Sequence, residues 1–396
     1  MIHCSVLAGV LCGVAGFACA QAQFIPLGDL PGDRFLSTSF DVSAHGNVVV
    51  GDGKVFGGFA GYQAFRWEAS EGMTSLGNLP SSYPESSAYG VSPGGRYIVG
   101  GSSSYAGHQA FMWSRETGIF GLGDLPGRDF LSIAQGVSAG GRVVVGYSDS
   151  AENRDGSWQA FRWTPEHGMQ GLGFHEGSVR DHSLAHDVSS DGVTIVGSSS
   201  IRRGSWDTFA GFRWTESTGM VALDGLPWRG TIGPSEARAV SSDGGYAAGF
   251  SASDLADIDE AVLWGPDNQP RGLGYLPYDG KAHYGSLAMD VSRNGRVVVG
   301  TADLPLGDYH AFVWTEHTGM MKLTDALRHN GIDVEELGWR LEWGWSVSAD
   351  GHWVAGQGRN PDGNYEAYLA YLPEIPAPST LPPLALAALL ATRRRR

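Results

Sequence analysis

Hydrophobic and polar positions alternate along this chain in short runs, which are separated by Gly, Ser, Asn and Asp. In one representative stretch the runs are Ser39 to Ser43, Val48 to Gly51, Gln63 to Trp67 and Met73 to Gly77. β-Branched and aromatic residues dominate them, which is typical of β-strands bounded by turns. A helical apolar period does not extend over ten or more residues anywhere, so the pattern predicts an all-β chain.

This set of four strands recurs along the chain, and each copy carries the pattern Val-Ser-x-x-Gly-x4-Gly. The copies begin at Val42, Val91, Val137, Val188, Val240, Val291 and Val347. Successive valines are 46 to 56 residues apart. Four strands in a unit of about 50 residues are typical of a propeller blade, which needs its neighbours to bury its apolar faces. Residues 23–373 are therefore predicted to form a seven-bladed β-propeller of four-stranded blades.

The seventh repeat lacks a fourth strand, and Ala370 stands where the other repeats have tryptophan. The missing piece lies at the other end of the chain, where Phe24 to Pro31 matches Met73 to Pro80 in its Leu-Gly-x-Leu-Pro ending. We expect the amino-terminal strand to complete the last blade. Closing the ring in this way removes exposed sheet edges, which invite aggregation.

Three residue types recur at fixed places in the repeat. The first glycine follows pairs such as Ser190-Asp191, which is typical of a tight turn with positive φ, and the repeated serine is predicted to hydrogen-bond the turn backbone. A tryptophan recurs in the third strand and is predicted to pack between adjacent sheets; a ring of sugar-stacking tryptophans is the alternative. These are Trp67, Trp113, Trp163, Trp214, Trp264 and Trp314.

Residues 1–22 lie outside the repeats and have the character of a secretory signal peptide. The segment from Val6 to Ala20 is apolar, and a small-x-small cleavage site lies around Ala20, Gln21 and Ala22. A membrane anchor is the alternative. All three cysteines lie in this leader, so the mature chain is expected to contain no disulfide, reactive thiol or cysteine metal site.

The net charge of the chain is −15, and the last four residues are arginines, so the body without them carries −19. An acidic surface repels phosphate backbones, which argues against nucleic acid as a partner.

The repeat unit resembles the HAF family of extracellular repeats over about residues 24–372. The resemblance rests on Val-Ser-x-Asp-Gly, on His/Gln-Ala-Phe-x-Trp-Thr and on Gly-Met-x-x-Leu-Gly, and His310-Ala311-Phe312 carries the family's name. Gln63, Gln109 and Gln159 replace the histidine elsewhere. The resemblance implies an exported repeat protein, but it implies no particular activity.

Residues 374–396 resemble a PEP-CTERM sorting signal. Pro376, Ala377, Pro378 and Ser379 precede an apolar stretch and the four arginines, although Ala377 stands where the family usually has glutamate. The resemblance implies transient anchoring in the inner membrane of a Gram-negative-type envelope and cleavage by an exosortase-like protease. The apolar stretch is shorter than the ~20 residues that span a bilayer. A frayed end with a chance basic run is the alternative.

Two kinds of metal site are weighed against ordinary solvated loops. His175, His182 and His186, near Asp181 and Asp187, form the densest cluster of ligand-type residues. The oxygen-rich stretches are Asp254, Asp257, Asp259 and Glu260 in one loop, and Asp362-Gly363-Asn364 with Glu366 in another. These suit calcium, but they lack the spacing of a dedicated calcium loop. No catalytic, cofactor-binding or metal-ligating residue is assigned, and calcium is the one cofactor considered.

Trp339, Trp343, Trp345 and Trp353 gather in the last repeat. They are predicted to pack at the ring closure, and an exposed platform for a glycan is the alternative. The expected function is that of an exported, non-catalytic binding or structural module at the cell surface or in the extracellular matrix, with extracellular polysaccharide as a possible ligand. A propeller enzyme acting on glycans, as a lyase or hydrolase, is the second expectation. Polar residues present on one or two blades and converging on the central channel would favour the enzyme.

Processing of the two chain ends can be tested by mass spectrometry of the mature protein from its native host. We expect a chain that starts near Gln21 or Gln23 and ends before Leu381, because the leader and the tail are both predicted to be removed. Recovery of Arg396 on extracellular protein would contradict the sorting role of the tail.

Overall fold

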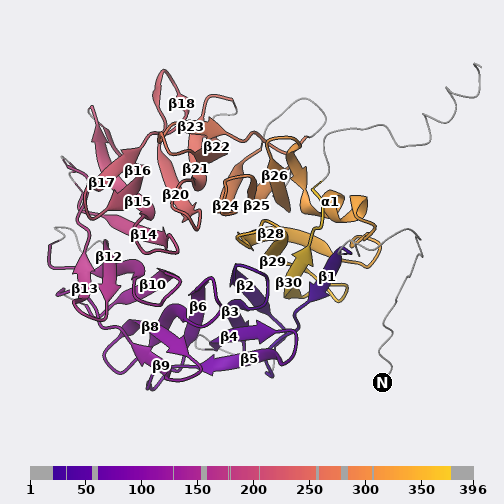
Figure 1. Cartoon of the computed structure of the whole chain (residues 1–396), viewed down its shortest axis with the longest axis horizontal. Helices are drawn as coiled ribbons and strands as arrows, with labels where there is room; N and C mark the ends of the chain where they lie inside the picture. The colour runs from indigo at the N-terminus through magenta and orange to yellow at the C-terminus, as the bar shows by residue number, and fades with distance from the viewer. Residues whose placement is uncertain are drawn as a thin grey trace, which may run out of the picture.

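The computed structural model describes residues 21–375, except for 33, 56–60, 128, 153–157, 177, 179, 205, 256–257, 278–283 and 306. These residues form seven four-stranded antiparallel sheets arranged in a ring, which is a seven-bladed β-propeller (Figure 1). The predicted fold class is confirmed, and all four strands expected in the first repeat are present.

Each blade begins with its innermost strand and proceeds outward. Blade 1 contains β2 (Ser37–Val42), β3 (Val49–Lys54), β4 (Tyr62–Glu68) and β5 (Gly72–Gly77). Blade 2 contains β6 (Ser86–Val91), β7 (Ile98–Ser103), β8 (His108–Ser114) and β9 (Gly118–Gly121). Blade 3 contains β10 (Ser132–Val137), β11 (Val144–Asp149), β12 (Trp158–Thr164) and β13 (Gly168–Gly171). Blade 4 contains β14 (Ser183–Val188), β15 (Ile195–Arg203), β16 (Trp206–Thr215) and β17 (Gly219–Leu223).

The next two blades follow the same order. Blade 5 contains β20 (Ser235–Val240), β21 (Ala247–Ser253), β22 (Ile258–Trp264) and β23 (Pro270–Gly272). Blade 6 contains β24 (Ser286–Val291), β25 (Val297–Leu304), β26 (Asp308–Thr315) and β27 (Gly319–Lys322). A short hairpin between blades 4 and 5 consists of β18 (Pro227–Trp228) and β19 (Thr231–Ile232).

Blade 7 is built from both ends of the repeat region. Its strands are β28 (Arg340–Val347), β29 (Trp353–Arg359), β30 (Tyr365–Tyr371) and, outermost, β1 (Gln23–Pro26). Phe24 pairs with Ala370 and Ile25 with Leu369, and the backbone N–H of Leu27 donates to the Ala367 carbonyl at 3.0 Å. The predicted closure of the ring by the amino-terminal strand is confirmed.

The pattern of strands did not predict the helix α1 (Leu323–His329), which follows β27. A helix of seven residues is too short to show an apolar period. Its buried Leu323, Ala326 and Leu327 belong to the apolar cluster between blades 6 and 7. This insertion accounts for the largest interval between repeat valines, from Val291 to Val347.

The six recurrent tryptophans all belong to apolar clusters that join adjacent blades, as predicted. Trp67, Trp264 and Trp314 are buried, whereas Trp113, Trp163 and Trp214 are half-buried. The phenylalanine two positions earlier is buried more uniformly. It is fully buried at Phe65, Phe111, Phe161, Phe212 and Phe312.

A buried serine at the start of the first strand joins neighbouring blades, and the repeat pattern did not single it out. Ser183 accepts a hydrogen bond from the Ala160 N–H at 2.9 Å and donates one to the Gly173 carbonyl at 2.7 Å. Both partners belong to the preceding blade. The same pair of bonds forms at Ser37, Ser86, Ser132, Ser235 and Ser286. A neutral hydrogen bond contributes about 1 kcal/mol net, so these serines help to hold the ring together.

The predicted roles of the repeated serine and of the first glycine are confirmed. Ser43 accepts a hydrogen bond from the N–H of Val48 at 3.0 Å, and the other six serines accept from the residue five positions later. The first glycine has φ between 68° and 81° in every repeat, which requires glycine in this turn.

The apolar segments at the two chain ends lie mostly outside the described residues, as does Ala20 in the expected leader cleavage region and Pro376 to Ser379 in the expected sorting motif. Gln21 and Ala22 directly precede β1. In the described part of the chain, none of the helices has the length and apolar character to cross a membrane.

Deleting residues 24–30 should lower the free energy of unfolding by at least about 3 kcal/mol, since it removes the Phe24 ring from its contacts with Trp339 and Tyr368 and exposes the edge of β30. Chemical denaturation measures this loss. The control Phe24→Leu keeps the strand and an apolar side chain, and it should unfold near the parent. An unchanged midpoint after the deletion would contradict the role of β1 in closure.

Candidate functional site

The first strand of every blade lines the central channel and contains a β-bulge. In β14, Ala185 pairs with Gly197 and Asp187 pairs with Val196, so that His186 is the extra residue. Register shifts at the same place occur in the first strands of all seven blades. A bulge interrupts the alternation of side chains and re-aims them. Each blade therefore directs two consecutive residues toward the channel.

The second glycine of the repeat lies opposite this bulge. A Cβ atom on Gly197 would lie 1.9 Å from the carbonyl oxygen of Leu184, closer than any side chain can approach. The corresponding distance is 1.8 to 2.0 Å in all seven blades. The recurring second glycine therefore marks the bulge, and through it the two channel residues.

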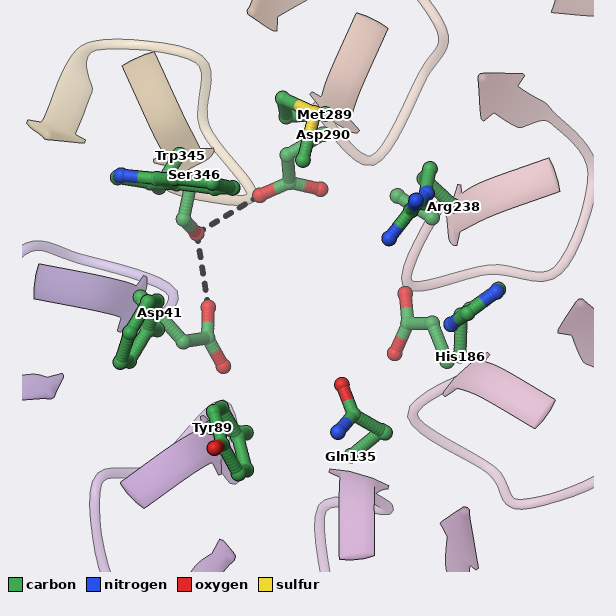
Figure 2. A pocket seen from close by; sticks show the side chains of 12 residues that line it. Asp41, Tyr89, Gln135, His186, Arg238, Met289, Asp290, Trp345 and Ser346 are labelled. Atoms are coloured by element: carbon green, nitrogen blue, oxygen red, sulfur yellow. Dashed lines mark hydrogen bonds between the residues drawn. The ribbon is translucent and has the colours of Figure 1, made fainter. Parts of the chain in front are cut away.

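Two rings of side chains result, and their residues differ from blade to blade. The outer set, here called the mouth ring, consists of Phe40, Tyr89, Gln135, His186, Arg238, Met289 and Trp345. The following positions, here called the inner ring, are Asp41, Gly90, Gly136, Asp187, Ala239, Asp290 and Ser346. The mouth ring and five inner-ring residues, which are Asp41, Asp187, Ala239, Asp290 and Ser346, line a cavity of about 270 Å³ (Figure 2). A second cavity of about 90 Å³ lies deeper, between the inner ring and the repeat valines.

Each aspartate of the inner ring joins two blades. Asp187 accepts hydrogen bonds from the backbone N–H of Val188 at 2.7 Å and from that of Val240 in the next blade at 2.8 Å. Asp41 accepts the equivalent pair from Val42 and from Val91 in blade 2, and Asp290 accepts it from Val291 and from Val347 in blade 7. These carboxyl groups therefore stabilise the ring as well as lining the cavity.

Ser346 lies between two of these aspartates. Its hydroxyl oxygen is 2.7 Å from Asp41 Oδ1 and 2.8 Å from Asp290 Oδ2, as the dashed lines in Figure 2 show. A hydroxyl group donates a single hydrogen, so it can serve both carboxyl groups only when one of them carries a proton and donates in turn. The arrangement therefore favours a state in which one of the two carboxyl groups carries a proton and the other is ionised.

Burial of the inner-ring carboxyl groups also favours their protonated form. It raises the pKa of Asp41 to about 6, and burial together with repulsion from Asp41 raises the pKa of Asp290 to about 7. Burial also raises the pKa of Asp187 well above its ordinary value. The charge of the inner ring therefore changes close to neutral pH.

A second polar group lies beside the cavity. His186 Nε2 is 3.1 Å from Glu236 Oε1, and Arg238 Nε is 2.6 Å from the same oxygen. Burial lowers the pKa of His186, which keeps its ring neutral. Burial opposes ionisation of Glu236, but contacts with His186 and Arg238 lower its pKa overall. The charge of Arg238 is therefore balanced by Glu236, and the aspartates set the net charge of the cavity.

Stacked aromatic rings lead into the cavity from one side. Trp343 and Trp345 are stacked with their centroids 4.7 Å apart at 6°, and Tyr309 stacks on Trp343 at 5.7 Å. Phe40 continues the series, 5.8 Å from Trp345 and 5.2 Å from Tyr89. These five residues, here called the aromatic track, run from blade 6 through blades 7 and 1 to blade 2.

The tryptophans predicted to gather in the last repeat are thus divided between two roles. Trp339 packs edge-on against Phe24, and Trp353 packs against Tyr371 at 4.7 Å, so both support the closure. Trp343 and Trp345 belong to the aromatic track, where both are half-buried and stacked on each other.

The predicted histidine cluster is not brought together. His175 lies against the Phe212 ring, His182 lies between Trp158 and Phe209, and His186 alone of the three lines the cavity. Of the residues named with them, Asp187 belongs to the inner ring and Asp181 is buried elsewhere. Within the described ranges, no group of three or more His, Cys, Asp or Glu side chains is placed to hold a metal ion.

The two acidic loops do not converge either. Asp254 accepts a hydrogen bond from the Arg229 N–H, Asp259 is exposed on β22, and Asp257 lies outside the described residues. Glu260 is buried and accepts from the Gly274 N–H at 3.1 Å. In the other loop, which contains the exposed Asp362-Gly363 turn and Asn364, Glu366 accepts from the Gly28 N–H at 3.0 Å and thereby supports the closure.

Most of the cavity residues were missed from the sequence, which singled out only His186, Asp187 and Trp345. The position before the repeat valine carries Asp41, Asp187 and Asp290, but it varies between repeats, so the repeat pattern does not mark it. The second glycine of the repeat could have identified this position, because it indicates a β-bulge in the strand paired with it.

No protein-family model matches this chain, and no curated protein does. Among solved structures it is similar to TolB from Acinetobacter baumannii, with 13% identity over 70% of this chain and a TM-score of 0.42, and it spans 60% of that TolB chain. It is also similar to the β-propeller domain of the Trilobed protease from Pyrococcus furiosus, with 10% identity and a TM-score of 0.49. That match covers 92% of this chain and 100% of the other. Dipeptidyl peptidase 4 from Porphyromonas gingivalis matches with 9% identity and a TM-score of 0.41, over 81% of this chain and 50% of the peptidase chain. No function follows from likeness at this level.

The raised pKa values predict how stability depends on pH. The ordinary pKa of aspartate is 3.8, so between about pH 4 and 7 the folded protein holds protons at Asp41 and Asp290 that the unfolded chain has released. This contribution is fully present below about pH 4, declines as the pH rises, and is lost once the pH has passed about 6 to 7.

Asp290→Asn should therefore reduce the fall in thermal midpoint measured by calorimetry between about pH 4 and 7. The control Glu216→Gln changes an exposed side chain and should keep the slope of the parent. A full slope in the Asp290 variant would contradict the titration of the inner ring.

Proposed function

We propose that this protein is an exported, non-catalytic propeller that binds polysaccharide at its channel mouth. The observation that carries the proposal is the stack of Tyr309, Trp343 and Trp345, which leads from the exposed face of the ring into a polar cavity.

The chemistry of the track suits a sugar ring. The C–H face of a pyranose packs on an aromatic face, while its hydroxyl groups need polar partners at the edge. The cavity offers such partners in the Gln135 amide and the inner-ring carboxyl groups, which Figure 2 shows pointing toward its centre from several blades. Tyr309 is 38% exposed, so the track is accessible at its outer end.

The proposed location follows from the chain ends and from the repeats. A cleaved leader, a PEP-CTERM-like tail processed by an exosortase-like protease and the resemblance to HAF repeats together support release to the cell surface or the extracellular matrix. The net charge of −15 supports a partner other than nucleic acid. In this account the membrane is a transient anchor during export.

A glycan lyase or hydrolase is the second candidate, and one observation favours it. The polar residues of the mouth ring are present on single blades and converge on the channel, which is how an enzyme was expected to differ from a featureless repeat. His186, neutral and in contact with Glu236, is the residue that could accept a proton from a substrate. Release of shortened products from a bound polysaccharide would establish this candidate.

Polysaccharide binding predicts that Tyr309→Ala, which removes the exposed outer ring of the track, lowers the affinity for a bound oligosaccharide by about tenfold, the effect of losing roughly 1.4 kcal/mol of stacking. Isothermal titration calorimetry against a panel of neutral, basic and acidic oligosaccharides measures this. Tyr83→Ala is the matched control, because Tyr83 is an exposed aromatic residue outside the track. Failure of every member of the panel to bind would contradict the proposed function.

A further inference from the structure

A second group of aromatic rings lies across the channel from the aromatic track. Tyr147 and Trp158 are stacked with centroids 4.9 Å apart, the His182 ring lies 6.0 Å from Trp158, and Phe209 lies 5.5 Å from His182. These four residues, here called the opposite array, belong to blades 3 and 4. In the ring of seven blades these face blades 7 and 1, which hold the centre of the track (Figure 1).

The two groups lie on the same face of the ring, because they share a position in the repeat. Trp158, Phe209 and Tyr309 all stand three residues before the phenylalanine of the third strand. Their exposed fractions are 37%, 42% and 38%. Large apolar side chains exposed at equivalent places on opposite blades indicate a contact surface.

The same position is also aromatic in blades 1 and 7, but there the rings are covered. Lys54 lies over the Tyr62 ring at 4.5 Å, and Arg359 lies over the Tyr365 ring at 4.2 Å. Trp158 and Tyr309 instead stack on rings that lead inward, Tyr147 and Trp343. Exposed aromatic rings that stack on inward-leading rings therefore lie on two sides of the mouth, at Trp158 and Tyr309, whereas the equivalent rings in blades 1 and 7 are covered.

The opposite array continues to the cavity through Tyr147. Tyr147 pairs with Ile133 on β10, the strand that carries Gln135 of the mouth ring. Trp158, Tyr147 and the mouth ring thus mirror Tyr309, Trp343 and Trp345 on the other side.

We infer that a single polysaccharide chain lies across the channel mouth, in contact with the aromatic track on one side and the opposite array on the other. This inference rests on the proposed function and adds to it a binding path and a minimum ligand length. A disaccharide can reach one array at a time, whereas a longer chain reaches both and gains affinity from each.

The charge of the mouth restricts the class of polysaccharide. Arg238 is the one lysine or arginine among the residues that line the cavity, and Glu236 already balances its charge, so the cavity offers no free positive charge to an acidic group. The whole chain is also acidic. A polymer rich in carboxylate or sulfate groups would be repelled at this site, so the ligand is a neutral or amine-bearing polysaccharide.

The test uses the full chain with disaccharides and hexasaccharides of glucose, N-acetylglucosamine and glucosamine, and with hexagalacturonate as the acidic probe. We expect at least one of the first three hexasaccharides to bind more tightly than its disaccharide and more tightly than hexagalacturonate. Trp158→Ala and Tyr309→Ala, which remove the exposed ring on each side, should each weaken binding of that hexasaccharide by about tenfold. The disaccharide should respond to one of the two substitutions.

Thermal melting of each variant, together with restored binding in Trp158→Phe, separates lost stacking from lost folding. If Tyr309→Ala weakens binding of the hexasaccharide while Trp158→Ala leaves it unchanged, the crossing path is wrong and the proposed function stands. Tightest binding of hexagalacturonate would overturn the assigned class of ligand. Absence of binding by every probe would overturn both proposals.

Discussion

The β-bulge in the first strand of each blade is the constraint on which the rest of the site depends. It presses a carbonyl oxygen against the neighbouring strand, and at Gly197 that oxygen would lie 1.9 Å from any Cβ atom. Glycine is therefore required there in every blade. The same irregularity directs two consecutive side chains toward the channel, so one backbone feature explains both a recurring residue and a ring of residues that do not recur.

The inner-ring aspartates show how stability and a binding site share the same groups. Asp187 accepts backbone hydrogen bonds from its own blade and from the next, yet it also lines the cavity. Burial raises the pKa values of these carboxyl groups, so ionised charge in the ring works against stability at neutral pH. Interactions that hold the blades elsewhere, such as the buried Ser183, are neutral and offset this cost.

The propeller could be predicted because its signals repeat. Seven copies of one pattern, and the match between Phe24 to Pro31 and a fourth strand, were sufficient for blade number and closure. The site could not be predicted in the same way, because its residues vary between blades and the bulge interrupts the alternation that relates sequence to sheet faces. Pairs such as Gln135 and Gly136 resemble ordinary strand residues until the bulge is placed.

The central claim is that the channel mouth is the binding surface of this molecule. A crystal structure of the full chain with its tightest-binding hexasaccharide tests it most directly. The account predicts sugar rings in contact with the exposed faces of Tyr309 and Trp158, with the chain passing above Gln135 and His186. Density for the oligosaccharide on another face of the propeller, with the mouth unoccupied, would contradict it.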